Sequence, residues 1–194
     1  MGSVIQCFLV HPTKNYRVNL RRYTRGSICP TNQWCHNADA FLGTEEHETG
    51  PVSGDMHPHD DPAWPAKCDR CDYRFVETDE WQKNHDLIYR TDDGREFTLV
   101  SADQMTNDKA MAAPPGTMWE APWMGPGPDG KSYVVRTPGG DWHIDGAYGT
   151  PNAGRWTRTG VAPNLTVSPS IGIGTKNGAW AYHGFLTNGV LREC

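Results

Sequence analysis

The sequence predicts an α+β fold made mainly of short antiparallel strands, with a zinc-stapled N-terminal part packed on a C-terminal β-rich unit. Three observations support this fold class. The 21 glycines and 15 prolines are scattered along 194 residues, which indicates many turns and short elements. Helical periodicity is scarce. Hydrophobic residues make up only 37% of the chain, although 8 of its residues are tryptophans that can add core area.

The first half of the chain predicts strands, an irregular segment and little helix. Residues 26–67 contain no clear element, and a compact domain with so long an irregular segment needs a crosslink such as a metal. Thr78 could cap a short helix that ends near His85. The other expected elements are strands at 3–10 and 16–23 with a turn at His11-Pro12, a strand at 73–76, a hairpin of 87–91 and 96–100 around Asp92-Asp93-Gly94, and a helix at 101–111.

The second half predicts a β-rich unit. Pro114-Pro115 and the Gly/Pro-rich residues 121–130 indicate a boundary, so we expect one part at 1–112 and another at 113–194. Asn188-Gly189 is a type I′ turn sequence and predicts a terminal hairpin. The expected strands are 132–137, 141–145, 180–186 and 190–192.

Charge and hydropathy exclude some classes of partner. The net charge is −5 and no basic run exceeds Arg21-Arg22, which argues against nucleic-acid binding. No apolar segment approaches 18 residues, and the N-terminus lacks the basic and apolar regions of a signal peptide, so we expect neither a membrane span nor secretion. We therefore expect the protein in a reducing cytoplasm, where paired cysteines bind metal or do redox chemistry rather than form disulfides.

The strongest local motif is Cys68-Asp-Arg-Cys71, in which two thiolates can grip one tetrahedral ion from a single turn. A second pair is needed, and Cys29 with Cys35 is the preferred choice. The sequence therefore predicts a closed structural zinc site of Cys29, Cys35, Cys68 and Cys71. One position stays open, because His36, His47, His57 or His59 could replace Cys29.

The stretch "GDMHPHDDP" is a second, weaker metal candidate. It places His57, His59, Asp60 and Asp61 within five residues. Such a stretch is more often a solvated loop.

A different group of polar residues lies in the last third of the chain. A serine nucleophile needs a base within hydrogen-bond reach and a group that orients the base. Ser170, with Ser168 in reserve, could be the nucleophile, His183 or His143 the base and Asp145 the orienting group. Glycines after Ser170 could free backbone N–H groups for an oxyanion.

Two other interpretations of these residues remain open. If the strands of His143 and His183 pair, the two histidines and Asp145 could form an open metal site. Alternatively, the alternation of Thr166, Ser168 and Ser170 marks an ordinary strand, with Pro169 at an edge or bulge.

The order "DWHIDG … W … P.LTVSPSI … YHGFLTNGVL.EC" in the C-terminal third resembles a phage and bacterial family, domain-of-unknown-function family 6527. The family pattern is a Cys/His element, a tryptophan, Pro-Thr-x-Ser-Pro-Ser, Cys-His and a glycine turn. The chain departs from it twice: "TPGGDWH" has no cysteine before the first histidine, and Tyr182 stands where relatives have cysteine. The matching residues are His143, Trp156, Pro163, Thr166, Ser168, Pro169, Ser170, His183 and Gly189.

The resemblance implies a phage-related source, and a peptidase role suggested for some relatives. We therefore carry two hypotheses: a zinc-binding phage-type hydrolase of peptide or isopeptide bonds, or a non-enzymatic virion protein associated with the head or tail. The expected partners are other protein chains, namely phage structural proteins or a peptide substrate. The expected location is the host cytoplasm or the virion.

Overall fold

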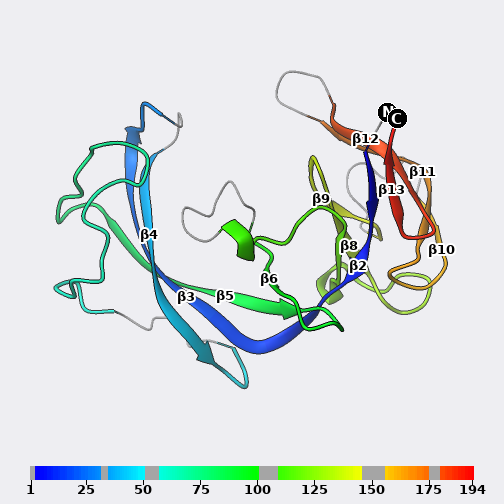
Figure 1. Ribbon diagram of the computed structural model, residues 1–194, viewed down its shortest axis with the longest axis horizontal. Helices are drawn as coiled ribbons and strands as arrows, with labels where there is room; N and C mark the ends of the chain where they lie inside the picture. Colours follow the sequence, from blue (N-terminus) through cyan, green and yellow to red (C-terminus); the bar gives the residue numbers. More distant parts are fainter. Residues whose placement is uncertain (1–2, 32–34, 51–56, 101–108, 146–155, 175–179) are drawn as a thin grey trace. The chain divides into compact units, whose positions relative to one another are not determined.

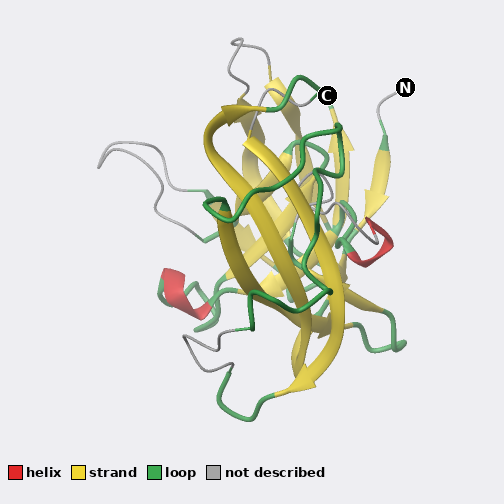
Figure 2. Cartoon of the chain, turned by 90° about the vertical axis from the view of Figure 1, so that its left-hand side faces the viewer, coloured by secondary structure: helices red, strands yellow, loops and turns green. Residues whose placement is uncertain are grey.

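The computed structural model describes residues 3–31, 35–50, 57–100, 109–145, 156–174 and 180–194. Strands and loops make up nearly all of this part of the chain (Figure 2). Its helices are the short 3-10 turns η1 (Lys109–Met111) and η2 (Pro122–Met124). The prediction of a mainly β fold with antiparallel sheets is confirmed. Within the described residues, no helix is long and apolar enough to cross a membrane.

The chain divides into two compact units. The N-terminal unit comprises Pro12–Arg90 and Glu96–Ala113. The C-terminal unit comprises Pro114–Cys194 together with Met1–His11 and Thr91–Arg95. One boundary thus falls at Pro114, beside the Pro114-Pro115 break, but the first residues of the chain belong with its last ones.

The N-terminal unit is built on one sheet with the strand order β4-β3-β5-β6. Its strands run alongside one another in Figure 1. β3 and β5 are longer than the strands expected at 16–23 and 87–91, whereas β6 is shorter than the strand expected at 96–100. The β5–β6 pair confirms the hairpin expected around Asp92-Asp93-Gly94. The strands are β3 (His11–Ile28), β4 (Cys35–Glu46), β5 (Glu80–Arg90) and β6 (Glu96–Thr98).

Four sequence predictions for this unit are wrong. No turn interrupts the chain at His11-Pro12, because β3 begins there; Pro12 precedes Asn15, where the ladder with β4 begins, so its missing N–H costs that ladder nothing. Residues 26–67 are not all irregular, since they include β4. The helix expected from Thr78 to His85 is replaced by β5. The strand expected at 73–76 is only an isolated bridge between Lys67 and Arg74. Most of the helix expected at 101–111 lies outside the described residues.

The C-terminal unit contains two sheets. One has the order β1-β13-β12-β11-β10, and the other has the order β2-β7-β8-β9. Their strands are β1 (Val4–Gln6), β2 (Phe8–Leu9), β7 (Thr117–Glu120), β8 (Tyr133–Thr137), β9 (Gly140–His143), β10 (Thr157–Thr159), β11 (Thr166–Gly174), β12 (Trp180–Thr187) and β13 (Val190–Glu193).

The strands predicted for this unit are present. β12 and β13 form the expected terminal hairpin, and Asn188 and Gly189 both have positive φ, 48° and 72°, as a type I′ turn requires. The ladder between β11 and β12 shifts register between Val167 and Ile171. Pro169 therefore lies in a bulge, which is one of the two places expected for it.

The core of this unit is mainly aliphatic, with the buried rings of Tyr133 and Tyr182, and is shared by both sheets. Met118 and Val135 come from one sheet, and Ile171 and Leu186 from the other, and all four are fully buried. Cys7, in the link between β1 and β2, joins the same cluster.

Candidate functional site

Four metal-ligating side chains meet at one end of the N-terminal unit. Their ligand atoms, three sulfurs and an imidazole nitrogen, all lie within 4.8 Å of one another. A tetrahedral ion with sulfur ligands at about 2.3 Å needs these atoms roughly 3.5–3.8 Å apart. The group could therefore hold one metal ion after small adjustments. It consists of Cys29, His36, Cys68 and Cys71.

The residues come from three segments that the fold brings together. Cys29 follows the end of β3, and His36 is the second residue of β4. Cys68 and Cys71 lie in a tight loop closed by the hydrogen bond from the Cys68 N–H to the Tyr73 carbonyl (2.9 Å). The Asp69 N–H also donates to the Asn37 carbonyl (3.0 Å), which fixes this loop against β4.

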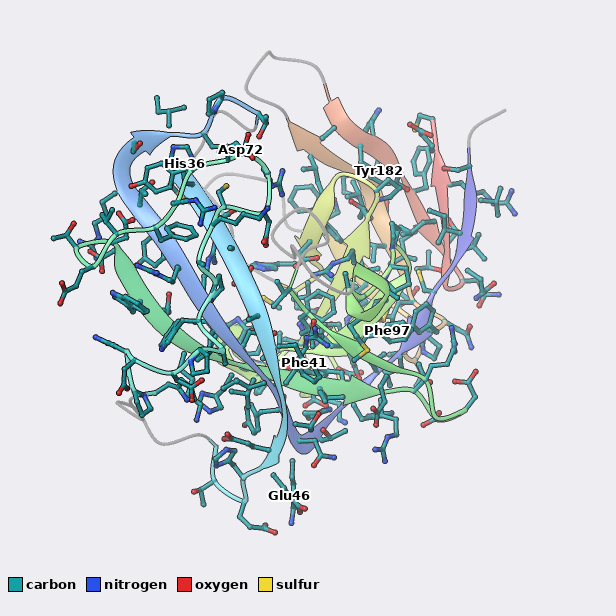
Figure 3. All side chains as sticks on the ribbon, turned by 60° about the vertical axis from the view of Figure 1, so that its left-hand side comes forward. His36, Phe41, Glu46, Asp72, Phe97 and Tyr182 are labelled. Atoms are coloured by element: carbon teal, nitrogen blue, oxygen red, sulfur yellow. The ribbon has the colours of Figure 1, made fainter. Side chains whose placement is uncertain are left out.

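His36, rather than Cys35, belongs to the group. Successive residues of a strand point to opposite faces, so His36 and Cys35 diverge. His36 lies 6% exposed, and its Nδ1 is 3.2 Å from Cys71 Sγ. The Tyr73 ring stacks on the imidazole at 4.1 Å and 13° (His36 is labelled in Figure 3). The segment "CHNADAFLGTEE" was expected to be irregular, because it has too few β-branched residues to predict a strand. Without a strand, the alternation of side chains between its two faces could not be used to choose His36 over Cys35.

Burial and hydrogen bonding act on the thiols in different directions. The hydrogen bond with the Thr31 hydroxyl (3.2 Å) lowers the pKa of Cys29 from 9.0 to about 7, even though burial opposes this. At Cys71 a backbone hydrogen bond from Tyr73 lowers the pKa, but burial and the thiols of Cys29 and Cys68 outweigh it and leave the pKa raised. A thiol that ionises readily is a ready metal ligand.

The surroundings of the group are closed and poor in aliphatic side chains. Cys29 is 0% and Cys68 2% exposed, and they share a small core with Ala38 and Phe75. All six cysteines lie in the described part of the chain, and none of them forms a disulfide. A metal ion bound by the four ligands could therefore hold these three segments together.

The loop that contains residues 57–61, the second metal candidate of the sequence, packs against the aromatic side chain of Trp81. Arg22 stacks on Trp81 with its guanidinium carbon 3.6 Å from the ring centroid, and it donates to the Val76 carbonyl (2.6 Å). His59 stacks on Trp81 at 4.8 Å, and His57 Nε2 pairs with Asp61 at 3.1 Å. Within the described residues, His57, His59, Asp60 and Asp61 belong to no group of three converging ligands.

In the C-terminal unit, Ser170 and His183 do come together. Ser170 Oγ lies 3.2 Å from His183 Nε2, because the bulged stretch of β11 passes beside β12. The Ser170 carbonyl accepts a hydrogen bond from Trp156 Nε1 (3.1 Å). Both side chains are half-buried, on the face of β12 opposite the buried Tyr182 and Leu186.

The other residues of the predicted serine site lie elsewhere. Asp145 accepts from Arg158 Nε (2.9 Å) and from the Tyr133 N–H (3.0 Å), so it orients Arg158 rather than a histidine. The condition for a metal site of His143, His183 and Asp145, namely pairing of the two histidine strands, is not met: β9 pairs with β8, and β12 pairs with β11 and β13. Ser168 is exposed opposite Thr157 of β10.

Comparisons with known proteins give no relative: no family model, curated protein or solved structure matches the chain. The site must therefore be interpreted from its own geometry. The Cys/His group has the ligands of a closed metal centre, and Ser170 with His183 pairs a hydroxyl with a base.

Proposed function

We propose that the protein is a zinc-binding protein in which Cys29, His36, Cys68 and Cys71 form a closed structural centre. One observation carries the proposal, namely that these four ligand atoms lie within 4.8 Å of one another although they come from three segments of the chain. Three thiolates and one imidazole are a known ligand set for structural zinc. Soft sulfur ligands in a tetrahedral arrangement favour zinc or iron over magnesium or calcium.

The centre would stabilise the fold rather than carry out a reaction. Four protein ligands leave no coordination position for water or substrate. The corner they occupy has Cys29, Ala38, Cys68 and Phe75 as its buried core, which offers little apolar area to hold the loops in place. Binding of the ion would supply the free energy that such a core lacks.

For the stabilised protein we propose a non-enzymatic role, as a head- or tail-associated component of a phage particle that contacts other protein chains. The phage setting is supported by the resemblance of the C-terminal third to a phage family. The non-enzymatic role is supported by the closed ligand set and by the involvement of Asp145 with Arg158.

The test is the zinc content of protein purified without added metal and dialysed against a carboxylate chelator that removes weakly held ions. We expect about one equivalent in the wild type and none in Cys68→Ser. Cys35→Ser is the matched control and should keep its zinc, because Cys35 points away from the group. A wild type that contains no metal, with all its thiols titratable in the native state, would overturn the proposal.

A second candidate function, hydrolysis of a peptide or isopeptide bond, is favoured by the distance of 3.2 Å between Ser170 Oγ and His183 Nε2. In that reaction the Ser170 oxygen would attack the carbonyl carbon while its proton passes to Nε2 of neutral His183. His183 would then give that proton to the leaving amine as the C–N bond breaks, and a water molecule would hydrolyse the resulting serine ester to release the acid. Labelling by a fluorophosphonate probe tests it. Label on the wild type and on Ser168→Ala, but not on Ser170→Ala or His183→Ala, would support catalysis, and an unlabelled wild type would exclude it.

A further inference from the structure

A second group of ligating side chains lies in the N-terminal unit, away from the cysteines. It consists of Glu45 on β4, His47 just beyond the end of β4, and His85 on β5. Figure 3 labels His36 and Glu46 toward opposite ends of β4. The nine residues from His36 to Glu45 correspond to roughly 30 Å of strand, so one ion cannot serve both groups.

The register of the sheet explains why these three residues meet. Glu45 is paired with Tyr16 of β3, and the His47 N–H donates to the Lys14 carbonyl (2.9 Å), which extends the same ladder. Glu45 and His47 are two residues apart and therefore share a face. β3 lies between β4 and β5, so His85 reaches the group from the other side of β3.

The distances fit a metal ion. His47 Nε2 lies 3.1 Å and His85 Nε2 3.3 Å from the same oxygen, Oε2 of Glu45. All three ligand atoms lie within 4.8 Å of one another. For an ion with bonds of about 2.0–2.1 Å to nitrogen and oxygen, tetrahedral geometry requires separations of roughly 3.3 Å.

The neighbouring groups position the carboxylate so that Oε2 faces the two histidines. Lys83 donates to Oε1 of Glu45 (3.2 Å), while the Tyr16 ring packs edge-on against His47 at 5.5 Å between ring centroids.

The group is open, in contrast to the cysteine centre. The His85 side chain is 9% exposed and that of Glu45 is 40% exposed, so the histidine is anchored in the sheet while the carboxylate faces solvent. The described chain places three ligands here, not four. A fourth coordination position would be available to water or a small anion.

We infer that Glu45, His47 and His85 form a second metal site that binds a divalent transition-metal ion such as Zn²⁺ through two imidazoles and one carboxylate, with one position open to solvent. Nitrogen and oxygen ligands of this kind suit zinc, copper, nickel and iron. The inference is independent of the cysteine centre.

The experiment titrates Zn²⁺ into protein whose cysteine centre is already loaded, followed by calorimetry. We expect one further equivalent to bind. Because loss of a partner outside the coordination shell costs 10–100-fold in affinity, loss of a direct ligand in His47→Ala or His85→Ala should weaken this event by about 100-fold or more. His11→Ala, which alters an exposed histidine in the C-terminal unit, is the matched control and should bind as the wild type does.

Cobalt substitution separates this site from the cysteine centre. Co²⁺ bound by thiolates gives an intense sulfur-to-metal charge-transfer band, whereas Co²⁺ bound by nitrogen and oxygen does not. The charge-transfer band should persist in His47→Ala and His85→Ala, which also shows that both variants fold. If the loaded wild type binds no further ion, or if both variants bind it as tightly as the wild type, the group is only a hydrogen-bonded cluster and the inference is overturned.

Discussion

The two units hold their strands together in different ways. In the C-terminal unit, Leu165, Ile171 and Leu186 are fully buried in one cluster shared by two sheets. At the cysteine end of the N-terminal unit, the buried cluster is Cys29, Ala38, Cys68 and Phe75, with no branched aliphatic side chain. The N-terminal unit does bury Val18, Leu20 and Ile88 in its sheet. The comparison teaches that a chain poor in aliphatic residues can leave one end of a unit without them and rely on ligand chemistry there.

The largest expected effect comes from removing a thiol ligand. In Cys29→Ser we expect the loops around the centre and the adjoining ends of β3 and β4 to unfold, because structural zinc supplies about 10 kcal/mol or more, which is comparable to the stability of a whole domain. Limited proteolysis measures this as new cleavage within the N-terminal unit. Cys35→Ser, which leaves the group intact, should be as resistant as the wild type; equal cleavage of the two variants would contradict the assignment of His36.

A smaller effect is expected from the buried ion network of the C-terminal unit. The Arg158 side chain is 3% exposed and contacts Asp145 (2.9 Å) and Asp129 (2.6 Å). Arg158→Met should destabilise this unit by about 3–5 kcal/mol, because it leaves the Asp145 charge buried without its partner. Lys131→Met, which breaks only an exposed pair with Glu120, should cost about 0–1 kcal/mol in the same denaturant titration. Similar losses in both variants would show that Arg158 is not specially placed.

Truncation of the aliphatic core should cost slightly less and should not depend on metal. Leu186→Ala removes a fully buried side chain and should lower the unfolding free energy of the C-terminal unit by about 2–5 kcal/mol. Phe185→Ala, on the opposite and exposed face of β12, is the control. A chelator should change the unfolding free energy of neither variant. A further decrease in Leu186→Ala when metal is removed would contradict the contrast between the units.

The smallest expected effect is a dependence on acid. The hydrogen bond from Arg158 lowers the pKa of Asp129 from 3.8 to about 2. A carboxyl with a lowered pKa in the folded state stabilises the protein above its unfolded pKa, and this contribution disappears as the pH falls from about 4 to about 2. Since the Asp129 side chain is 41% exposed, we expect only about 1 kcal/mol. Asp129→Asn should flatten that part of the stability profile, and an unchanged profile would contradict the assignment.

Local chemistry explains which elements the sequence could predict. The terminal hairpin could be predicted because Asn188-Gly189 favours the positive φ values that a type I′ turn requires. A helix was wrongly expected at residues 78–85 because Thr78 and Asp79 are residue types common at helix starts. In the structure the Asp79 carboxylate instead accepts hydrogen bonds from the Val76 N–H (2.8 Å) and the Tyr73 hydroxyl (3.2 Å) in a turn. Pairing with distant strands then makes the following residues a strand, and no local pattern reports that.

The candidate sites show the same limit. The spacing of Cys68 and Cys71 reports a metal loop directly, but the choice between Cys35 and His36 depends on which face of β4 meets that loop. Glu45 and His85 are 40 residues apart and come together only through the order of strands in the sheet. Sequence spacing therefore identifies ligands within one turn and cannot identify ligands that meet across strands.

The most direct test of the contrast is amide hydrogen exchange on the same sample before and after removal of metal by a strong chelator. We predict that protection is lost around Cys29, His36 and the 68–71 loop, while β8, β11 and β12 exchange as slowly as before. Loss of protection in both units alike, or in neither, would contradict the claim that a metal ion holds the cysteine end of the N-terminal unit while an apolar core holds the C-terminal unit.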